Sequence, residues 1–278
     1  MLYTDEQLEK QLVKLLMSLH FKNGCFAAIG LGVIALPFCA VAAESASDLA
    51  GALRAKEAGS TFVRVRMQIS SGENQIFQLQ IKSRVSNITS DIVYQVLFPK
   101  ERKGEAVLLH RSGEKFSGTT FAPPNTVRPI ASGQMNQALF GSDLSYEDII
   151  DNPFRWPQQA IVGTEAIDNI QCQILESKPG KGHSSSYSSV KTWVDPRRLV
   201  PLRIEKYDNS GKVLRRINIT RVLLDGNDSL PADLKVYGQR GTGTEITGSR
   251  IKRGVTYADS EFTLQGLKQV TARPGSPE

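Results

Sequence analysis

The stretch Val63-Arg-Val-Arg-Met-Gln-Ile69 alternates apolar and polar side chains without interruption. Phe77-Gln-Leu-Gln-Ile-Lys82 repeats this alternation, and four apolar side chains between Ile92 and Phe98 also share one parity. Successive side chains of a β-strand point to opposite faces of its sheet, so this period of two indicates strands with one buried and one solvated face. Such strands are typical of antiparallel sheets.

Further strand signals follow along the chain, separated by turn sequences such as Asp208-Asn-Ser-Gly211. They lie at residues 106–110, 170–175, 191–194, 201–207, 212–224, 232–237 and 244–252. We find neither a repeat nor a linker, and about ten meandering strands in one domain predict a strongly curved sheet. The predicted fold class is mainly β (α+β): a single curved antiparallel sheet forming an incomplete barrel, with short helices as a lid over the concave face.

Two segments have helical character. Residues 47–59 predict a short helix with Ser47 as its N-cap and Gly59 as its C-cap. Residues 135–150 predict two short helices separated at Gly141, with Ser145 and Asp148 spaced as a capping box. Helical turns inserted into a sheet protein must pack on the sheet, so we expect the second segment to form the lid.

The composition is that of a globular protein. Of 278 residues, 40% are hydrophobic and 22% charged, which excludes a disordered chain, a collagen-like fibre and a polytopic membrane protein. The net charge of +6 favours anionic neighbours such as membrane headgroups, although the commonest origin of a mild excess is a soluble surface.

The amino-terminal region predicts export. No charged residue lies between Gly24 and Ala43, Lys22 precedes this apolar run, Pro37 ends it, and Ala40-Val-Ala42 is a small-residue cleavage motif. Residues 1–43 are therefore expected to be a signal peptide that is cleaved near Ala42/Ala43 and directs the protein to the periplasm. An uncleaved anchor is the alternative, for which the run is short.

The segment before this run is long and acidic for a signal peptide, so the true start is hypothesised to be Met17. The predicted domain comprises residues 44–271, followed by a disordered tail at 272–278 that contains two prolines and a glycine.

A search for catalytic chemistry gives little. Beyond the predicted signal peptide the chain has one cysteine, Cys172, and two histidines, His110 and His183, without metal-ligand spacing. Ser188-Ser-Val-Lys191 matches a nucleophile motif of four common residue types, but it leads into a strand. The sequence thus predicts no enzyme, no metal, no cofactor and no nucleic-acid partner.

Several strings resemble one family. Leu97-Phe-Pro-Lys-Glu-Arg-Lys-Gly-Glu-Ala-Val-Leu108 and Phe140-Gly-Ser-Asp-Leu-Ser-Tyr-Glu-Asp148 are similar to the outer-membrane lipoprotein-sorting proteins, the LolA-like group. Trp193–Pro196, Pro201–Lys212 and Glu261–Leu264 continue this similarity in the same order, whereas Arg111 to Ile130 departs from it. The resemblance implies an incomplete antiparallel barrel closed by short helices, with an apolar cavity that takes lipid acyl chains.

Three groups of residues are candidates for this site. The expected apolar cavity residues are Val63, Val65, Met67, Phe77, Leu79, Ile81, Tyr94, Val96 and Phe98. The expected lid residues are Leu139, Phe140, Leu144 and Ile149. The family-like motif residues are Gly141, Ser142, Asp143, Tyr146 and Asp148, as a lid hinge or as a capped structural corner. For the apolar set, the alternative is a filled core without a cavity.

Two functions follow as expectations. The first is a periplasmic, non-catalytic carrier that binds lipid acyl chains, for lipoprotein or lipid transfer to the outer membrane. It could work with an inner-membrane transporter and an outer-membrane acceptor. The alternative is an envelope regulatory or scaffold module of the same fold, which senses lipids or partners a membrane transporter or a sigma-factor regulator.

Overall fold

The computed structural model describes residues 45–70, 74–239 and 243–272. All of the described residues belong to one compact unit. The predicted signal peptide, the hypothesised start at Met17 and the tail beyond Ala272 lie outside the described residues. None of the described helices is both long and apolar enough to cross a membrane.

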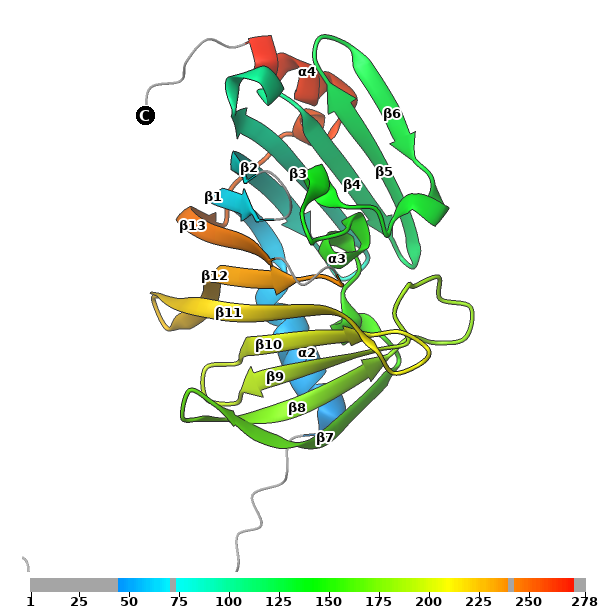
Figure 1. The fold of residues 1–278 in the computed structure, drawn as a ribbon, viewed down its shortest axis with the longest axis vertical. Coiled ribbons are helices and arrows are strands. Elements are labelled where there is room, and N and C mark those ends of the chain that lie inside the picture. Colours follow the sequence, from blue (N-terminus) through cyan, green and yellow to red (C-terminus); the bar gives the residue numbers. More distant parts are fainter. Residues whose placement is uncertain (1–44, 71–73, 240–242, 273–278) are drawn as a thin grey trace, which may run out of the picture. The chain divides into compact units, whose positions relative to one another are not determined.

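In the described residues, thirteen strands form one antiparallel sheet (Figure 1). The strands are β1 (Gly59–Ile69), β2 (Gln75–Val85), β3 (Thr89–Phe98), β4 (Ala106–Ser112), β5 (Lys115–Ala122), β6 (Thr126–Ile130), β7 (Gln158–Ile167), β8 (Ile170–Lys178), β9 (Ser189–Asp195), β10 (Val200–Tyr207), β11 (Val213–Asp225), β12 (Asp228–Tyr237) and β13 (Gly243–Arg253). The α-helices are α2 (Ala46–Glu57), α3 (Tyr146–Ile150) and α4 (Leu264–Ala272). The 3-10 helices are η1 (Lys100–Arg102), η2 (Ser132–Gln134), η3 (Leu139–Gly141), η4 (Pro153–Arg155) and η5 (Asp259–Phe262).

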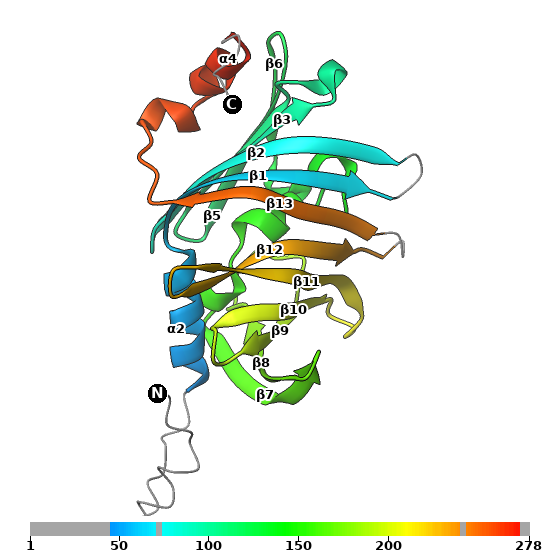
Figure 2. The same ribbon diagram turned by 90° about the vertical axis from the view of Figure 1, so that its left-hand side faces the viewer.

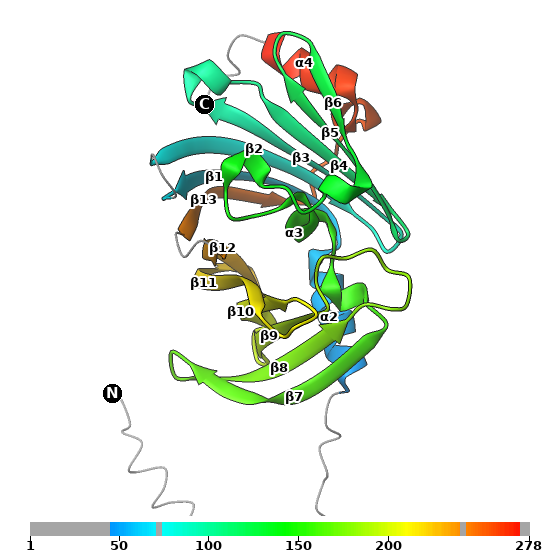
Figure 3. The ribbon, with the colours of Figure 1, turned by 45° about the vertical axis from the view of Figure 1, so that its right-hand side comes forward.

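The strand order explains how the chain crosses its own sheet. The order is β6-β5-β4-β3-β2-β1-β13-β12-β11-β10-β9-β8-β7. The chain therefore runs outward from β1 to one edge at β6, crosses to the opposite edge at β7 and returns to pair β13 with β1. Residues 131–157 make this crossing, and Figure 3 shows α3 and α2 within the curve of the sheet. Because β6 and β7 are not paired, the sheet is open, which confirms the predicted fold class.

Three strands were not predicted, β5, β6 and β7. All lie at or next to an edge of the sheet, and most of their side chains are exposed or only partly buried. An edge strand buries little apolar surface, so the alternation of side chains that signals a strand is weak there. Pro129 in β6 fits this position, because proline cannot donate to a hydrogen-bonded partner strand.

The N-cap of helix α2 lies two residues earlier than predicted and its C-cap one residue earlier. Its N-cap is Ser45, whose Oγ accepts a hydrogen bond from the Asp48 N–H at 3.1 Å, and its C-cap is Ala58 rather than Gly59. Gly59 instead begins β1 with a φ of 113°. The helix buries Leu49, Ala50 and Leu53 against β8 and β9.

The crossing segment is less helical than predicted. Residues 135–138 are not helical, η3 is a single 3-10 turn, and only Tyr146–Ile150 is α-helical. The predicted capping box is confirmed, since Ser145 Oγ accepts from the Asp148 N–H and Asp148 Oδ2 accepts from the Ser145 N–H. Gly141 has a φ of 87°, a conformation that favours glycine and ends η3.

The carboxyl-terminal segment covers the convex face at the other end of the sheet. Phe262 and Leu267 pack against Val93, Ala106 and Phe121 of β3, β4 and β5. Figure 2 shows this segment beside β3 and β6, far from β7. Strand β3 is therefore buried on both faces, with helices inside the curve and α4 outside it.

Candidate functional site

The apolar side chains predicted to share one surface are direct neighbours on three strands. The register pairs Val65 with Leu79 and Leu79 with Val96, and the next row pairs Val63, Ile81 and Tyr94 in the same way. Met67 pairs with Phe77. Because opposite residues of antiparallel strands project from the same face, these side chains form one continuous apolar surface.

Phe98 is not part of this surface. A bulge at Leu97 shifts the register, so that Val96 lies opposite Leu79 but Phe98 lies opposite Gln78. A one-residue shift moves the following side chain to the other face of the sheet. Phe98 is accordingly 47% exposed, which corrects its expected inward orientation.

One end of the apolar surface is filled. Met67, Phe77 and Val96 are at most 1% exposed. Phe140 from the crossing segment stacks on Phe77 with ring centroids 6.0 Å apart, and the Arg102 guanidinium lies 4.7 Å from the Phe77 ring. At this end, the alternative of a packed core describes the structure.

The other end opens into a cavity of about 330 Å³. Six of the predicted residues line it: Val63, Val65, Met67, Leu79, Ile81 and Tyr94. Leu144 of the crossing segment also lines it. The remaining apolar lining was not predicted as part of the site and comprises Leu230, Pro231, Ala232, Leu234, Ile246 and Ile251, on the neighbouring strands β12 and β13. Strand signals at 232–237 and 244–252 were evident in the sequence, but nothing local indicates that β13 pairs with β1 and completes the cavity.

A second cavity of about 300 Å³ adjoins the first. Its walls come from β2, β3, β10 and β11 and from residues 148–154, and they include Ser83, Val85, Ile92, Ile204 and Ile217. Glu57, Ile81 and Tyr94 line both cavities. The concave side thus holds two mainly apolar spaces that meet at these three residues.

The four predicted lid residues pack in two places. Leu139, Phe140 and Ile149 pack in the cluster on the β3 and β4 side. Leu144 packs with Ile217 of β11 and Val236 of β12. The crossing segment therefore contacts both sides of the curve.

The motif residues form buried anchors. Ser142 and Asp143 are at most 4% exposed. The Asp143 N–H donates to Thr244 Oγ1 at 2.9 Å, and the Thr244 hydroxyl donates to Asp143 Oδ2 at 2.8 Å. Thr244 is fully buried in β13, so this pair fixes the crossing segment to the centre of the sheet. Tyr146 is buried in the cluster on the β3 and β4 side.

Asp148 lies at the centre of a buried ionic cluster. Its carboxylate is 2.8 Å from Lys206 Nζ and 2.9 Å from Arg215 Nε, and it accepts a hydrogen bond from the Tyr187 hydroxyl at 2.8 Å. Burial alone would raise the pKa of Asp148, but the positive charges of Lys206 and Arg215 lower it to about 2. The carboxylate therefore stays ionised and ties α3 to β10 and β11.

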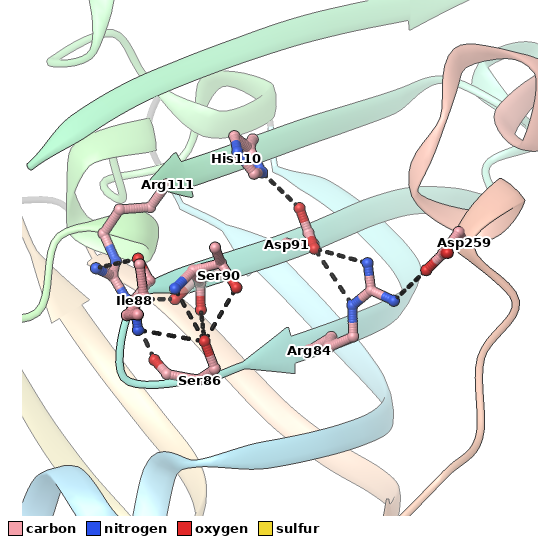
Figure 4. A network of polar contacts seen from close by, with 9 residues as sticks. Arg84, Ser86, Ile88, Ser90, Asp91, His110, Arg111 and Asp259 are labelled. Atoms are coloured by element: carbon pink, nitrogen blue, oxygen red, sulfur yellow. Dashed lines mark hydrogen bonds and ion pairs between the residues drawn. The ribbon is translucent and has the colours of Figure 1, made fainter. Parts of the chain in front are cut away.

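The residues considered for catalysis have structural partners. His110 Nδ1 lies 2.6 Å from Asp91 Oδ1, and Arg84 joins Asp91 to Asp259 in a network on β2, β3 and η5 (Figure 4). Cys172 is fully buried. The Ser188 hydroxyl donates to the Asp208 carbonyl. Among the described residues, no group of three or more His, Cys, Asp and Glu side chains could hold a metal ion.

A protein-family profile described as an uncharacterized protein matches residues 89–269, well over half of the chain. The chain belongs to this family. No curated protein sequence matches the chain.

Solved structures share the fold of this family member. A DUF1329 family protein from Desulfovibrio piger superposes with a TM-score of 0.74 at 22% identity, covering 80% of this chain and 97% of the other. A putative outer membrane lipoprotein-sorting protein domain from Vibrio parahaemolyticus gives 0.72 at 18% identity, with 80% and 97% covered. A LolA superfamily protein from Nitrosomonas europaea gives 0.63 at 20% identity, with 79% and 97% covered. The predicted resemblance to lipoprotein-sorting proteins is confirmed as a likeness of fold.

Proposed function

We propose that the protein is a non-catalytic carrier that binds lipid acyl chains in the cavities on the concave side of its sheet. One observation carries this proposal: the predicted apolar rows of β1, β2 and β3 line a cavity of about 330 Å³ instead of a uniformly filled core. Removing an acyl chain from water gains about 0.8 kcal/mol per CH₂, so a dry cavity suffices for binding and no catalytic group is needed.

The cellular setting is part of the same proposal. Residues 1–43 have the sequence pattern of a signal peptide, which supports export to the periplasm. The likeness of fold to a lipoprotein-sorting domain supports lipid or lipoprotein transfer to the outer membrane as the purpose of binding. In this role, an inner-membrane transporter would deliver the ligand and an outer-membrane acceptor would receive it.

Binding of an apolar fluorescent probe to the purified, delipidated protein tests the proposal. Val63 is half-buried and lines the cavity, so Val63→Trp should fill the space without placing a charge in the core. We expect this variant to fold and to lose most of the probe binding. Val162→Trp is the matched control, because Val162 is 47% exposed on the edge strand β7. Undiminished probe uptake by folded Val63→Trp contradicts the placement of the ligand.

The Leu79→Glu variant tests the stability of the apolar surface as well as probe binding. Leu79 borders the cavity but is 1% exposed and packs with Val65 and Val96. An unpaired buried charge costs several kcal/mol, so we expect this variant to unfold at a much lower urea concentration than the wild type. If a folded Leu79→Glu protein takes up the probe normally, the account of this surface is wrong. If the wild-type protein takes up no probe at all, the alternative function of a scaffold module with the same fold is favoured.

A further inference from the structure

Two polar groups lie where the two apolar cavities meet. Glu57 and Tyr94 line both cavities together with Ile81. The proposed carrier function uses the apolar walls and assigns no role to either polar group. A carboxylate and a phenol at the junction of two apolar spaces are positioned to contact the polar part of an amphiphile whose chains fill those spaces.

Glu57 occupies an unfavourable position for a helix. It is the last residue of α2, where the partial negative charge of the helix dipole disfavours a carboxylate. Its Oε2 accepts a hydrogen bond from the Asn152 amide, and it makes no ion pair with any residue in the described ranges. Desolvation by the surrounding protein raises its pKa to about 7, against the opposing effects of Arg155 and of this hydrogen bond, although the residue as a whole is exposed. Helix stability therefore does not account for an acid here.

Tyr94 supplies the complementary group. Burial raises the pKa of its hydroxyl to about 12, so the hydroxyl stays protonated and can donate a hydrogen bond. In the described part of the chain the Tyr94 hydroxyl has no hydrogen-bond partner. Glu57 can thus accept, and Tyr94 can donate, at the junction of the two cavities.

Most of the other charges around this space are paired. Asp148 pairs with Lys206 and Arg215, and Asp151 pairs with His183. Asp228 pairs with both Lys56 and Arg253. The charged side chains that line the two cavities or act on Glu57 are Lys56, Asp148, Asp151, Arg155, Lys206 and Arg253.

An ionic headgroup of either sign would meet a like charge here. An anion would approach the Glu57 carboxylate, and a cation would approach Lys56 and Arg253 in the first cavity and Lys206 in the second. An uncharged group that both donates and accepts, such as a hydroxyl or an amide, meets no repulsion and satisfies both Glu57 and Tyr94.

We propose that Glu57 and Tyr94 form the headgroup site of the carrier and select lipids with an uncharged hydroxyl or amide group over fatty-acid anions. This inference rests on the proposed acyl-chain binding and adds the chemical class of the ligand.

The test compares three probes of equal chain length at pH 8: a monoacylglycerol, a fatty acid and an alkylammonium. Isothermal titration to the delipidated wild type should give the tightest binding for the monoacylglycerol, by at least about ten-fold over the fatty acid. Binding of the three probes within about two-fold of one another overturns the inference, as does preference for either ionic probe.

Two variants separate the roles of the polar groups. Glu57→Gln should strengthen fatty-acid binding by about ten-fold, because it removes the repulsion between two carboxylates. Tyr94→Phe should weaken monoacylglycerol binding by about five-fold and leave fatty-acid binding unchanged. Glu101→Gln, at an exposed position in η1, is the control and should change neither.

The outcomes distinguish this inference from the carrier function. If both variants shift all three probes equally, the headgroup site is wrong. If an apolar probe binds but the headgroups are not distinguished, the carrier function stands and the inference fails. If no probe binds, both fail.

Discussion

Asp148 carries a negative charge in the interior because cations and a hydroxyl surround its two oxygens. Lys206 and Arg215 come from β10 and β11, whereas Asp148 belongs to α3 of the crossing segment. The same carboxylate caps α3 through Ser145. This one side chain therefore combines a local role in starting a helix with a long-range role in holding that helix on the sheet.

Removing the charge should be costly. Asp148→Asn leaves Lys206 and Arg215 without their counter-ion, so we expect a loss of about 3–5 kcal/mol in the free energy of unfolding at pH 7. Because the folded-state pKa of Asp148 is lowered to about 2 from 3.8, its contribution should be present above pH 4 and be lost as the pH falls toward 2. Urea unfolding of the variant and the wild type measures both effects.

The control is an exposed pair of the same chemistry. Glu245 Oε1 lies 2.8 Å from Lys235 Nζ, and both side chains are more than one-third exposed. Glu245→Gln should therefore change the free energy of unfolding by less than about 1 kcal/mol. An Asp148→Asn effect as small as that of this control would show that the buried cluster does not hold the crossing segment in place.

Glu57 predicts a pH dependence of the opposite sign. Its pKa is raised from 4.5 to about 7, so the folded protein holds a proton that the unfolded chain releases in this range. Stability should therefore fall as the pH rises from about 4.5 to 7, and Glu57→Gln should remove this fall and stabilise the protein at pH 8. Urea midpoints at pH 5 and pH 8 check the prediction, with Glu101→Gln as control. Parallel pH profiles of wild type and Glu57→Gln would contradict it.

At the scale of elements, two glycines make a contrasting pair. A Cβ at Gly248 of β13 would lie 2.8 Å from the Ala232 carbonyl oxygen, a backbone atom that cannot rotate away. Gly248→Ala should therefore push β12 from β13 and lower the free energy of unfolding by about 1–3 kcal/mol. A Cβ at Gly51 of α2 meets nothing within 4 Å.

The second member of the pair should respond in the opposite direction. Gly51→Ala should raise the free energy of unfolding by about 0.5–1 kcal/mol, because alanine loses less entropy than glycine when a helix forms. Thermal unfolding of both variants provides the comparison. Equal effects of the two substitutions would contradict the close approach of β12 and β13.

A strand could be predicted from the sequence where one of its faces is buried and the other is solvated. β1 and β2 alternate strictly because one face packs inward and the other is solvated, so their period was evident in the sequence. β7 exposes most of its side chains at the sheet edge and gave no such signal. The bulge at Leu97 shows a further limit, because it depends on how β3 pairs with β2 and moves Phe98 to the outer face.

At the scale of the whole molecule, the site depends on a contact between distant parts of the chain. β1 pairs with β13, which places Ile246 beside Met67 and Ile251 beside Val63, so that they extend the rows predicted on β1 and β2. Half of the cavity wall was therefore predictable from alternation, and the other half required the strand order. The position of the crossing segment also depends on the strand order. Because β6 and β7 are the two edge strands, the chain that joins them passes over the concave side of the sheet.

The carrier role itself is tested most directly by native mass spectrometry of the purified protein, exported from its host and kept under gentle conditions. The account predicts a species heavier than the polypeptide by the mass of a lipid, which is lost in Val63→Trp and retained in Val162→Trp. A wild-type protein that carries no lipid, and that after delipidation takes up no fatty-acyl probe, would contradict the account.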